Sequence, residues 1–268
     1  MEIPEAEVAE APSWFVEVPS SFEGLATQAA RALVGAIRTG QRRLVVEAAA
    51  PELDPTSGES FRITELTAFA HDIARPLLDL GLPASKSHVK LLFASSADAT
   101  LAGSSIFTTS MPVSVLGHPN AIGPRDGAFV VVAPSAADRA VNAEAALSGL
   151  LQQAGGRTVV IINPRLGNAP LLSTFETCYL MRRLSVAYLV DQTAQQVDRV
   201  HACLLRCYPH EWSVLFERPR AATKSALTAQ PWRYAGRFTT QPAPEQLEAL
   251  LQREITRARD DAWRNDVE

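Results

Sequence analysis

Polar side chains gather near the ends of two predicted strands, and they are the residues of this chain best suited to form a binding site. Glu47 ends a short apolar run, while Asn163 and Arg165 follow a longer one. In a parallel sheet such strand ends meet at one edge, where open α/β proteins usually hold a ligand. Glu176 and Arg183 belong to a helix that we expect shortly afterwards. Carboxylates, an amide and a guanidinium group in one crevice would suit a small anion or a peptide.

A structural role for the same residues is the simpler interpretation, and we favour it. The Asn163 side chain would cap the turn that Pro164 begins, because Asn readily bonds to nearby backbone groups in turns. Glu176 would pair with an arginine one helical turn away. These polar groups would then hold the scaffold in shape, and none of them would be catalytic.

The usual sequence signatures of catalysis and of cofactor binding do not occur in the chain. It contains no GxGxxG turn, no GxxxxGK[ST] phosphate loop and no GxSxG nucleophile elbow. Its histidines have no metal-ligand spacing, and the serine-rich segment 95–110 is expected to be a loop. Cys178, Cys203 and Cys207 are better explained as buried thiols than as a metal site. We therefore predict no catalytic residue, no metal and no cofactor, and we favour a protein that is not an enzyme over an enzyme.

Helices and strands alternate over the first two-thirds of the chain, which favours a mostly parallel, helix-flanked, Rossmann-like α/β sheet. Residues 158–162 are five β-branched residues with no polar face, a pattern typical of a strand that is covered on both sides. We expect residues 175–184 to form the helix that follows it. Further strands are then predicted, some of them antiparallel at one edge of the sheet; they span residues 186–190, 201–207, 212–216 and 232–238.

Composition limits the class of protein. The chain has 268 residues, 47% of them hydrophobic, and a formal net charge of −4. That length supports one domain, predicted at residues 18–263, after an acidic tail at residues 1–17 that we expect to be unstructured. The slightly negative net charge argues against a nucleic-acid partner. RNA binding through Arg38, Arg42 and Arg43 is a weaker alternative. No apolar stretch approaches the about 20 residues that cross a bilayer, so only peripheral membrane association is expected.

Several short segments follow one another in an order that is similar to a known family. The chain resembles the DUF1995 family of cyanobacteria and plastids from about residue 18 to residue 251. The segments that carry the resemblance are Val18–Phe22, Arg43–Glu47, Pro51–Leu53, Ile161–Leu166, Phe175–Leu184 and Gly236–Phe238, the last of them before Pro242.

The resemblance implies a role in photosynthesis, although the function of the family is largely undefined. One plant member, low PSII accumulation 3, is associated with photosystem II assembly on the stromal side of thylakoids, and another copy of the domain is fused to a plastid adenylate kinase. The expected function is thus that of a non-catalytic interaction protein, peripheral to photosynthetic membranes, that aids assembly or stability of a photosystem complex. Its expected location is the plastid stroma and thylakoid surface, or the cyanobacterial cytoplasm at the thylakoid.

Two kinds of binding site follow from these expectations. A photosystem subunit would bind an exposed apolar patch or a sheet edge, for which Trp212, Phe216 and Trp232 are the candidates, although burial in the core would explain each of them more simply. The alternative function is binding, or conversion, of a nucleotide or phosphorylated metabolite in the strand-end crevice near Glu47 and Asn163.

Overall fold

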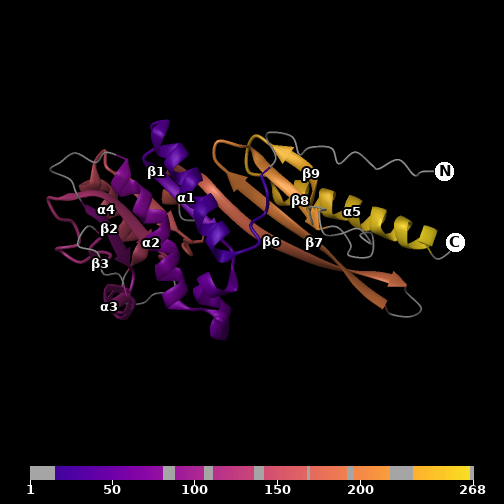
Figure 1. The fold of residues 1–268 in the computed structure, drawn as a ribbon, viewed down its shortest axis with the longest axis horizontal. Coiled ribbons are helices and arrows are strands. Elements are labelled where there is room, and N and C mark those ends of the chain that lie inside the picture. Colours follow the sequence, from indigo (N-terminus) through magenta and orange to yellow (C-terminus); the bar gives the residue numbers. More distant parts are fainter. Residues whose placement is uncertain are drawn as a thin grey trace, which may run out of the picture.

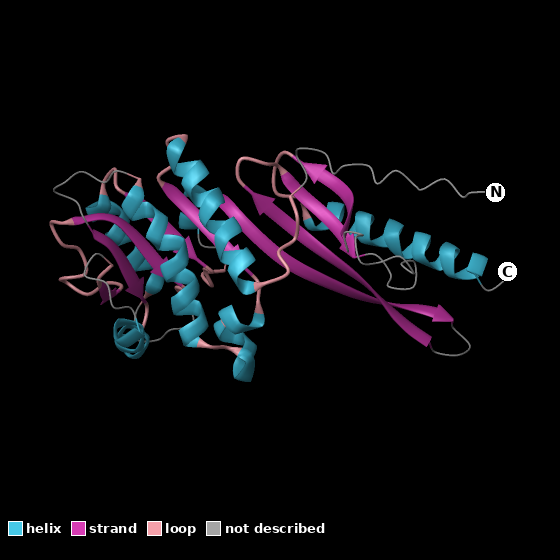
Figure 2. Cartoon of the chain, viewed as in Figure 1, coloured by secondary structure: helices cyan, strands magenta, loops and turns pink. Residues whose placement is uncertain are grey.

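A computed structural model describes residues 16–80, 88–105, 111–135, 142–167, 170–191, 196–217 and 232–265. It shows one sheet with helices on both of its faces, elongated by a long hairpin (Figures 1 and 2). The helices and short 3-10 turns are α1 (Phe22–Arg38), η1 (Pro51–Leu53), η2 (Pro55–Ser60), α2 (Ile63–Asp79), α3 (Ser96–Ser105), α4 (Ala143–Ala154), η3 (Pro170–Thr174) and α5 (Pro244–Asn265). The strands are β1 (Arg43–Ala48), β2 (His88–Phe93), β3 (Val113–Val115), β4 (Asp126–Val132), β5 (Thr158–Ile162), β6 (Glu176–Asp191), β7 (Gln196–Cys207), β8 (Trp212–Glu217) and β9 (Trp232–Phe238).

The sheet has a parallel half and an antiparallel half. Its nine strands lie in the order β3-β2-β4-β5-β1-β6-β7-β8-β9. Neighbours from β3 to β6 pair in parallel, and those from β6 to β9 pair antiparallel. This arrangement confirms the predicted α/β class, including antiparallel strands added toward the C-terminus.

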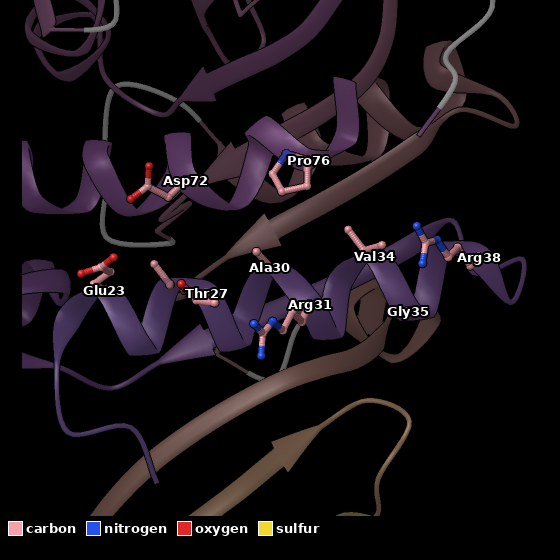
Figure 3. A pocket seen from close by; sticks show the side chains of 10 residues that line it. Glu23, Thr27, Ala30, Arg31, Val34, Gly35, Arg38, Asp72 and Pro76 are labelled. Carbon is pink, nitrogen blue, oxygen red and sulfur yellow. The ribbon is translucent and has the colours of Figure 1, made fainter. Parts of the chain in front are cut away.

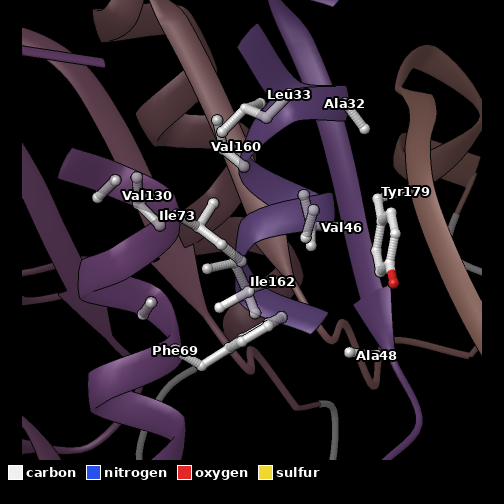
Figure 4. Packing of buried hydrophobic residues seen from close by; sticks show 14 of the residues in the cluster. Ala32, Leu33, Val46, Ala48, Phe69, Ile73, Val130, Val160, Ile162 and Tyr179 are labelled. Carbon is white, nitrogen blue, oxygen red and sulfur yellow. The ribbon is translucent and has the colours of Figure 1, made fainter. Parts of the chain in front are cut away.

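Each face of the sheet is covered by its own helices. α1 and α2 pack on one face, where Leu33, Phe69 and Ile162 belong to one buried cluster (Figure 4). α4 and α5 cover the opposite face over different strands, α4 over β4 and β5 and α5 over β7 and β8. All five residues of β5 are buried, because helices or connecting segments cover both of its sides, as its continuous apolar run predicts.

The expected helix at residues 175–184 is wrong. Residues 176–191 form the 16-residue strand β6, which also contains the separately predicted strand at 186–190. Cys178 is an extra residue there, because Val45 pairs with Thr177 whereas Val46 pairs with Tyr179. The bulge interrupts the two-residue alternation of a strand, and it leaves an apolar spacing in the sequence that resembles a helix. Pairing with β1 on one side and β7 on the other stabilises the extended conformation.

The serine-rich segment also differs from expectation. Residues 96–105 form α3 rather than a loop, and the Ser95 hydroxyl accepts a hydrogen bond from the backbone N–H of Asp98 at 3.0 Å, which caps the helix. Residues 106–110 lie outside the described part of the chain, as do residues 1–15 of the predicted tail. The next residue, Val16, packs against the core, and the Glu17 carbonyl accepts a hydrogen bond from the Gln28 side chain at 2.8 Å.

Candidate functional site

The connections after β1 and β5 leave the sheet toward opposite faces. β1 leads through η1 to α2, whose apolar side chains belong to the cluster beneath α1 and α2. β5 leads through η3, whose Leu171 and Leu172 pack against the α4 side. Two adjacent parallel strands whose connections diverge in this way define the point where such sheets usually open a ligand crevice.

Asn163 fills this crevice with its own side chain. Its side chain is fully buried, and its Oδ1 accepts a hydrogen bond from the Ala48 N–H at 2.7 Å. Its Nδ2 donates to the carbonyl oxygens of Ala48 and Leu53, both at 3.1 Å. The backbone of Asn163 has φ 47°, a left-handed conformation that Asn tolerates better than most residues, and it turns the amide toward β1. The side-chain hydrogen bonds of Asn163 therefore run to distant segments rather than to its own turn, where the cap was predicted, and they join the ends of β1 and β5 to η1.

Arg165 closes the same edge two residues later. Its guanidinium group forms an ion pair with Asp54 at 2.7 Å, and its backbone N–H donates to the Pro134 carbonyl at 2.8 Å. The ion pair ties the segment after β5 to the segment after η1. Asp54 was not expected from the sequence, since it lies in a turn-rich stretch with no motif around it.

Glu47 and Glu176 do not join Asn163. Glu47 alternates with the core residues of β1, points to the α4 and α5 side of the sheet, and pairs with Arg182 on β6. Glu176 lies level with Leu44, near the amino end of β1, and pairs with Arg206 of β7 at 3.1 Å. An arginine partner for Glu176 was expected one helical turn away, whereas the partner lies on the neighbouring strand.

Arg183 differs from the rest of the predicted set because it is exposed and has no ion pair among the described residues. It is exposed beyond the end of β1 and lines a cavity of about 520 Å³ between β6 and the start of α1. Ser20 and Ser21 form the wall at the helix start, where the Ser21 hydroxyl accepts from the Gly24 N–H at 3.0 Å. The charged residues on the remaining wall are Glu52, Arg62 and Glu65.

The three candidate aromatic residues lie in different surroundings. Trp212 and Phe216 are 5% and 1% exposed and pack in the cluster beneath α5, so burial in the core explains both. Trp232 is half-buried and lines a cleft of about 120 Å³ together with Arg183 and His201. The predicted ligand-binding and partner-binding sets therefore meet at Arg183 and Trp232.

The cysteines are buried, as predicted, and they are poor nucleophiles. Burial raises the pKa of Cys178 and of Cys203 to about 12, and that of Cys207 to about 11. Their thiols therefore stay protonated at neutral pH, and the thiolate is the form that attacks substrates and binds metals. Within the described ranges, His, Cys, Asp and Glu side chains form no group of three that would hold a metal ion.

A second concave surface, which sequence analysis missed, lies between α1 and α2 (Figure 3). This groove has a volume of about 610 Å³. Arg31 and Arg38 line it, but so do Glu23 and Asp72, so it is not the uniformly basic face typical of RNA-binding proteins. The signal in the sequence was the outer stripe of α1, which runs Glu23, Thr27, Ala30, Val34 and Arg38.

No helix in the described portion of the structure has the length and apolar character of a bilayer span.

Comparison with known proteins places the chain in a family. No curated protein matches the chain. The model of a domain of unknown function, DUF1995, matches residues 19–249, which is most of the 268 residues. The chain therefore belongs to the DUF1995 family.

Proposed function

We propose that this protein is a non-catalytic interaction protein that acts at the surface of photosynthetic membranes and aids assembly or stability of a photosystem complex. One observation carries the non-catalytic part of the proposal: the crevice between β1 and β5 is filled by the buried side chain of Asn163. Two other residues of the predicted site are also paired within the fold: Arg165 with Asp54 beside Asn163, and Glu47 with Arg182 on the α4 and α5 side of the sheet. Groups engaged in this way support the scaffold and are not free to bind a substrate.

The partner would bind the sheet surface next to the start of α1. Arg183 is exposed there between the cavity of about 520 Å³ and the cleft of about 120 Å³. The half-buried Trp232 offers an aromatic side chain beside this cation, and interface residues that contribute most to affinity are often tryptophan and arginine. The photosynthetic partner itself is proposed from family membership.

Affinity capture tests this function. The tagged chain is incubated with detergent-solubilised thylakoid membranes, and the captured proteins are identified by mass spectrometry. We expect photosystem subunits to be enriched, and Arg183→Glu and Trp232→Ala each to reduce the capture at least about fivefold, equivalent to about 1 kcal/mol. Arg43→Glu is the matched control, because Arg43 is exposed at the far end of β1. Capture of no photosynthetic protein, or equal capture by all variants, would contradict the proposal.

Binding of a nucleotide or phosphorylated metabolite is the second candidate, and the cavity beside α1 favours it. Arg62 and Arg183 line that cavity together with the start of a helix, where anions are stabilised. We rank this function second because the negative charges of Glu52 and Glu65 on the same wall offset the positive charges of the two arginines. Thermal unfolding with millimolar nucleotides and sugar phosphates tests it, since a ligand that binds the folded state raises the midpoint. A shift that Arg183→Glu abolishes would support this function, and no shift with any compound would refute it.

A further inference from the structure

The groove between α1 and α2 takes no part in the proposed function, and its charges have a definite order. Glu23 and Asp72 lie toward one end, Arg38 lies at the other, and Arg31 lies between them (Figure 3). Two acidic and two basic side chains therefore line the groove, and they balance in sign. Glu23 and Arg38 are separated by most of the 17-residue helix, which is a distance of about 22 Å at 1.5 Å per residue.

Three of these four charges find no partner among the residues that the structure describes. Glu23, Arg31 and Arg38 are exposed and take part in none of its hydrogen bonds or ion pairs, whereas Asp72 is bonded to His71 at 3.3 Å. Opposite charges at the two ends of one groove are therefore available to an outside partner.

The groove also has the shape that accepts a helix. Besides Arg31 and Pro76, its surface between the charged ends includes small side chains on α1, namely Thr27, Ala30 and Val34, which recur at spacings of three and four residues. Such a spacing keeps one side of a helix in contact with a second helix that lies along it. Ala30 and Val34 are only partly buried by this chain, so a second helix would remove further apolar surface from water.

We propose that this groove is the seam of a two-fold symmetric homodimer, in which α1 packs antiparallel against α1 of a second copy of this chain. With the symmetry axis between Ala30 and Arg31, Glu23 of each copy lies opposite Arg38 of the other, and Thr27 lies opposite Val34. A two-fold axis forms every such contact twice, and it requires a surface that is complementary to itself. Acidic residues at one end of the groove and Arg38 at the other meet that requirement, and the two Arg31 side chains lie beside the axis.

The available area predicts a weak, reversible dimer. α1 and α2 each have 17 residues, so together they offer a surface about 25 Å long and about 20 Å wide. Two copies would bury about 1,000 Å² in total, which is near the lower limit for a specific interface. The dimer is therefore expected to dissociate over the micromolar range.

Sedimentation equilibrium of the full chain between about 1 and 300 μM tests the proposal. The native chain is expected to pass from monomer to dimer. Glu23→Arg and Arg38→Glu should each weaken the dimer at least about tenfold, because each turns two attractive pairs into repulsive ones. An equimolar mixture of the two variants should form a heterodimer, since it restores an acidic residue opposite a basic one at both contacts. The exposed Arg43→Glu is the control and should dimerise like the native chain.

Several results would overturn this inference. A native chain that stays monomeric at 300 μM would exclude the dimer, and a dimer that neither variant weakens would place the interface elsewhere. Two monomeric variants that do not associate when mixed would exclude the antiparallel arrangement. Both single substitutions change exposed side chains, so each variant should keep the circular dichroism spectrum of the native chain; the mixture therefore tests the pairing with folded proteins.

Discussion

Substitution of Asn163 measures how far the strand-end crevice has become part of the scaffold. Asn163→Ala removes three buried hydrogen bonds, two to Ala48 and one to Leu53. Each hydrogen bond contributes about 1 kcal/mol net, and an alanine at φ 47° adds about 1 kcal/mol of backbone strain. The free energy of unfolding should therefore fall by about 4 kcal/mol. Asn163→Gly loses the same bonds but adopts a positive φ freely, and it should cost about 3 kcal/mol.

The assay is equilibrium unfolding in urea, followed by circular dichroism and extrapolated to zero denaturant. Arg183→Ala is the control, because an exposed side chain without a hydrogen-bond partner among the described residues should change stability by no more than about 0.5 kcal/mol. A loss below about 1 kcal/mol for Asn163→Ala would refute the scaffold role. It would mean that the amide is available to a ligand, as the alternative function requires.

Asn163→Asp adds a test through pH. An ionised carboxylate would still accept from the Ala48 N–H, but it would face the carbonyl oxygens of Ala48 and Leu53. Burial and these two oxygens would raise its pKa in the folded state above the unfolded value of about 3.9. The stability of the Asn163→Asp variant relative to the native chain is therefore highest below about pH 4, and it falls as pH rises through the pKa of the carboxyl group in the folded state. Unfolding free energies at pH 4 and pH 8 check this sign, and an equal loss at both would contradict it.

Two further predictions concern the antiparallel half of the sheet. Burial raises the pKa of Cys178, Cys203 and Cys207, so the unfolded chain loses these thiol protons at a lower pH than the folded chain, and the free energy of unfolding should fall as pH rises above about 9. Replacement of all three cysteines by alanine should flatten this pH dependence. Iodoacetamide should label the three thiols only when urea has unfolded the chain. A Cβ at Gly236 would lie 3.0 Å from a methyl group of Leu250, so the side chain in Gly236→Val would crowd the contact of β9 with α5. The free energy of unfolding, measured in urea, should therefore fall by about 1–3 kcal/mol. An unchanged free energy of unfolding would contradict this packing.

Local patterns in the sequence predict several elements because they follow from neighbours along the chain. The outer boundaries of α4 are set by Asn142, whose side chain accepts from the Ala145 N–H, and by Gly155 at φ 58°. Pro244 begins α5, and the apolar run 158–162 forms the buried strand β5. Each signal acts through bonds or burial within a few residues, so one sequence suffices to find it.

The polar residues show what local patterns omit. Asn163 and Arg165 were found as candidates because they follow a strand, but their partners are Ala48, Leu53 and Asp54, more than 100 residues earlier. No periodicity in one sequence indicates such a pair. The distinction between a site and a scaffold therefore depended on contacts between distant segments.

The sequence by itself determined the alternation of helices and strands, the buried cysteines and the absence of the common catalytic motifs. Tertiary structure alone decided that residues 176–191 are a strand, because hydrogen bonds to β1 and β7 outweigh a local pattern that a bulge has disturbed. It also decided that the Asn163 amide closes the crevice and that α1 and α2 form a groove with opposite charges at its ends. Short-range propensity selects an element, whereas pairing between distant segments decides which surfaces stay open.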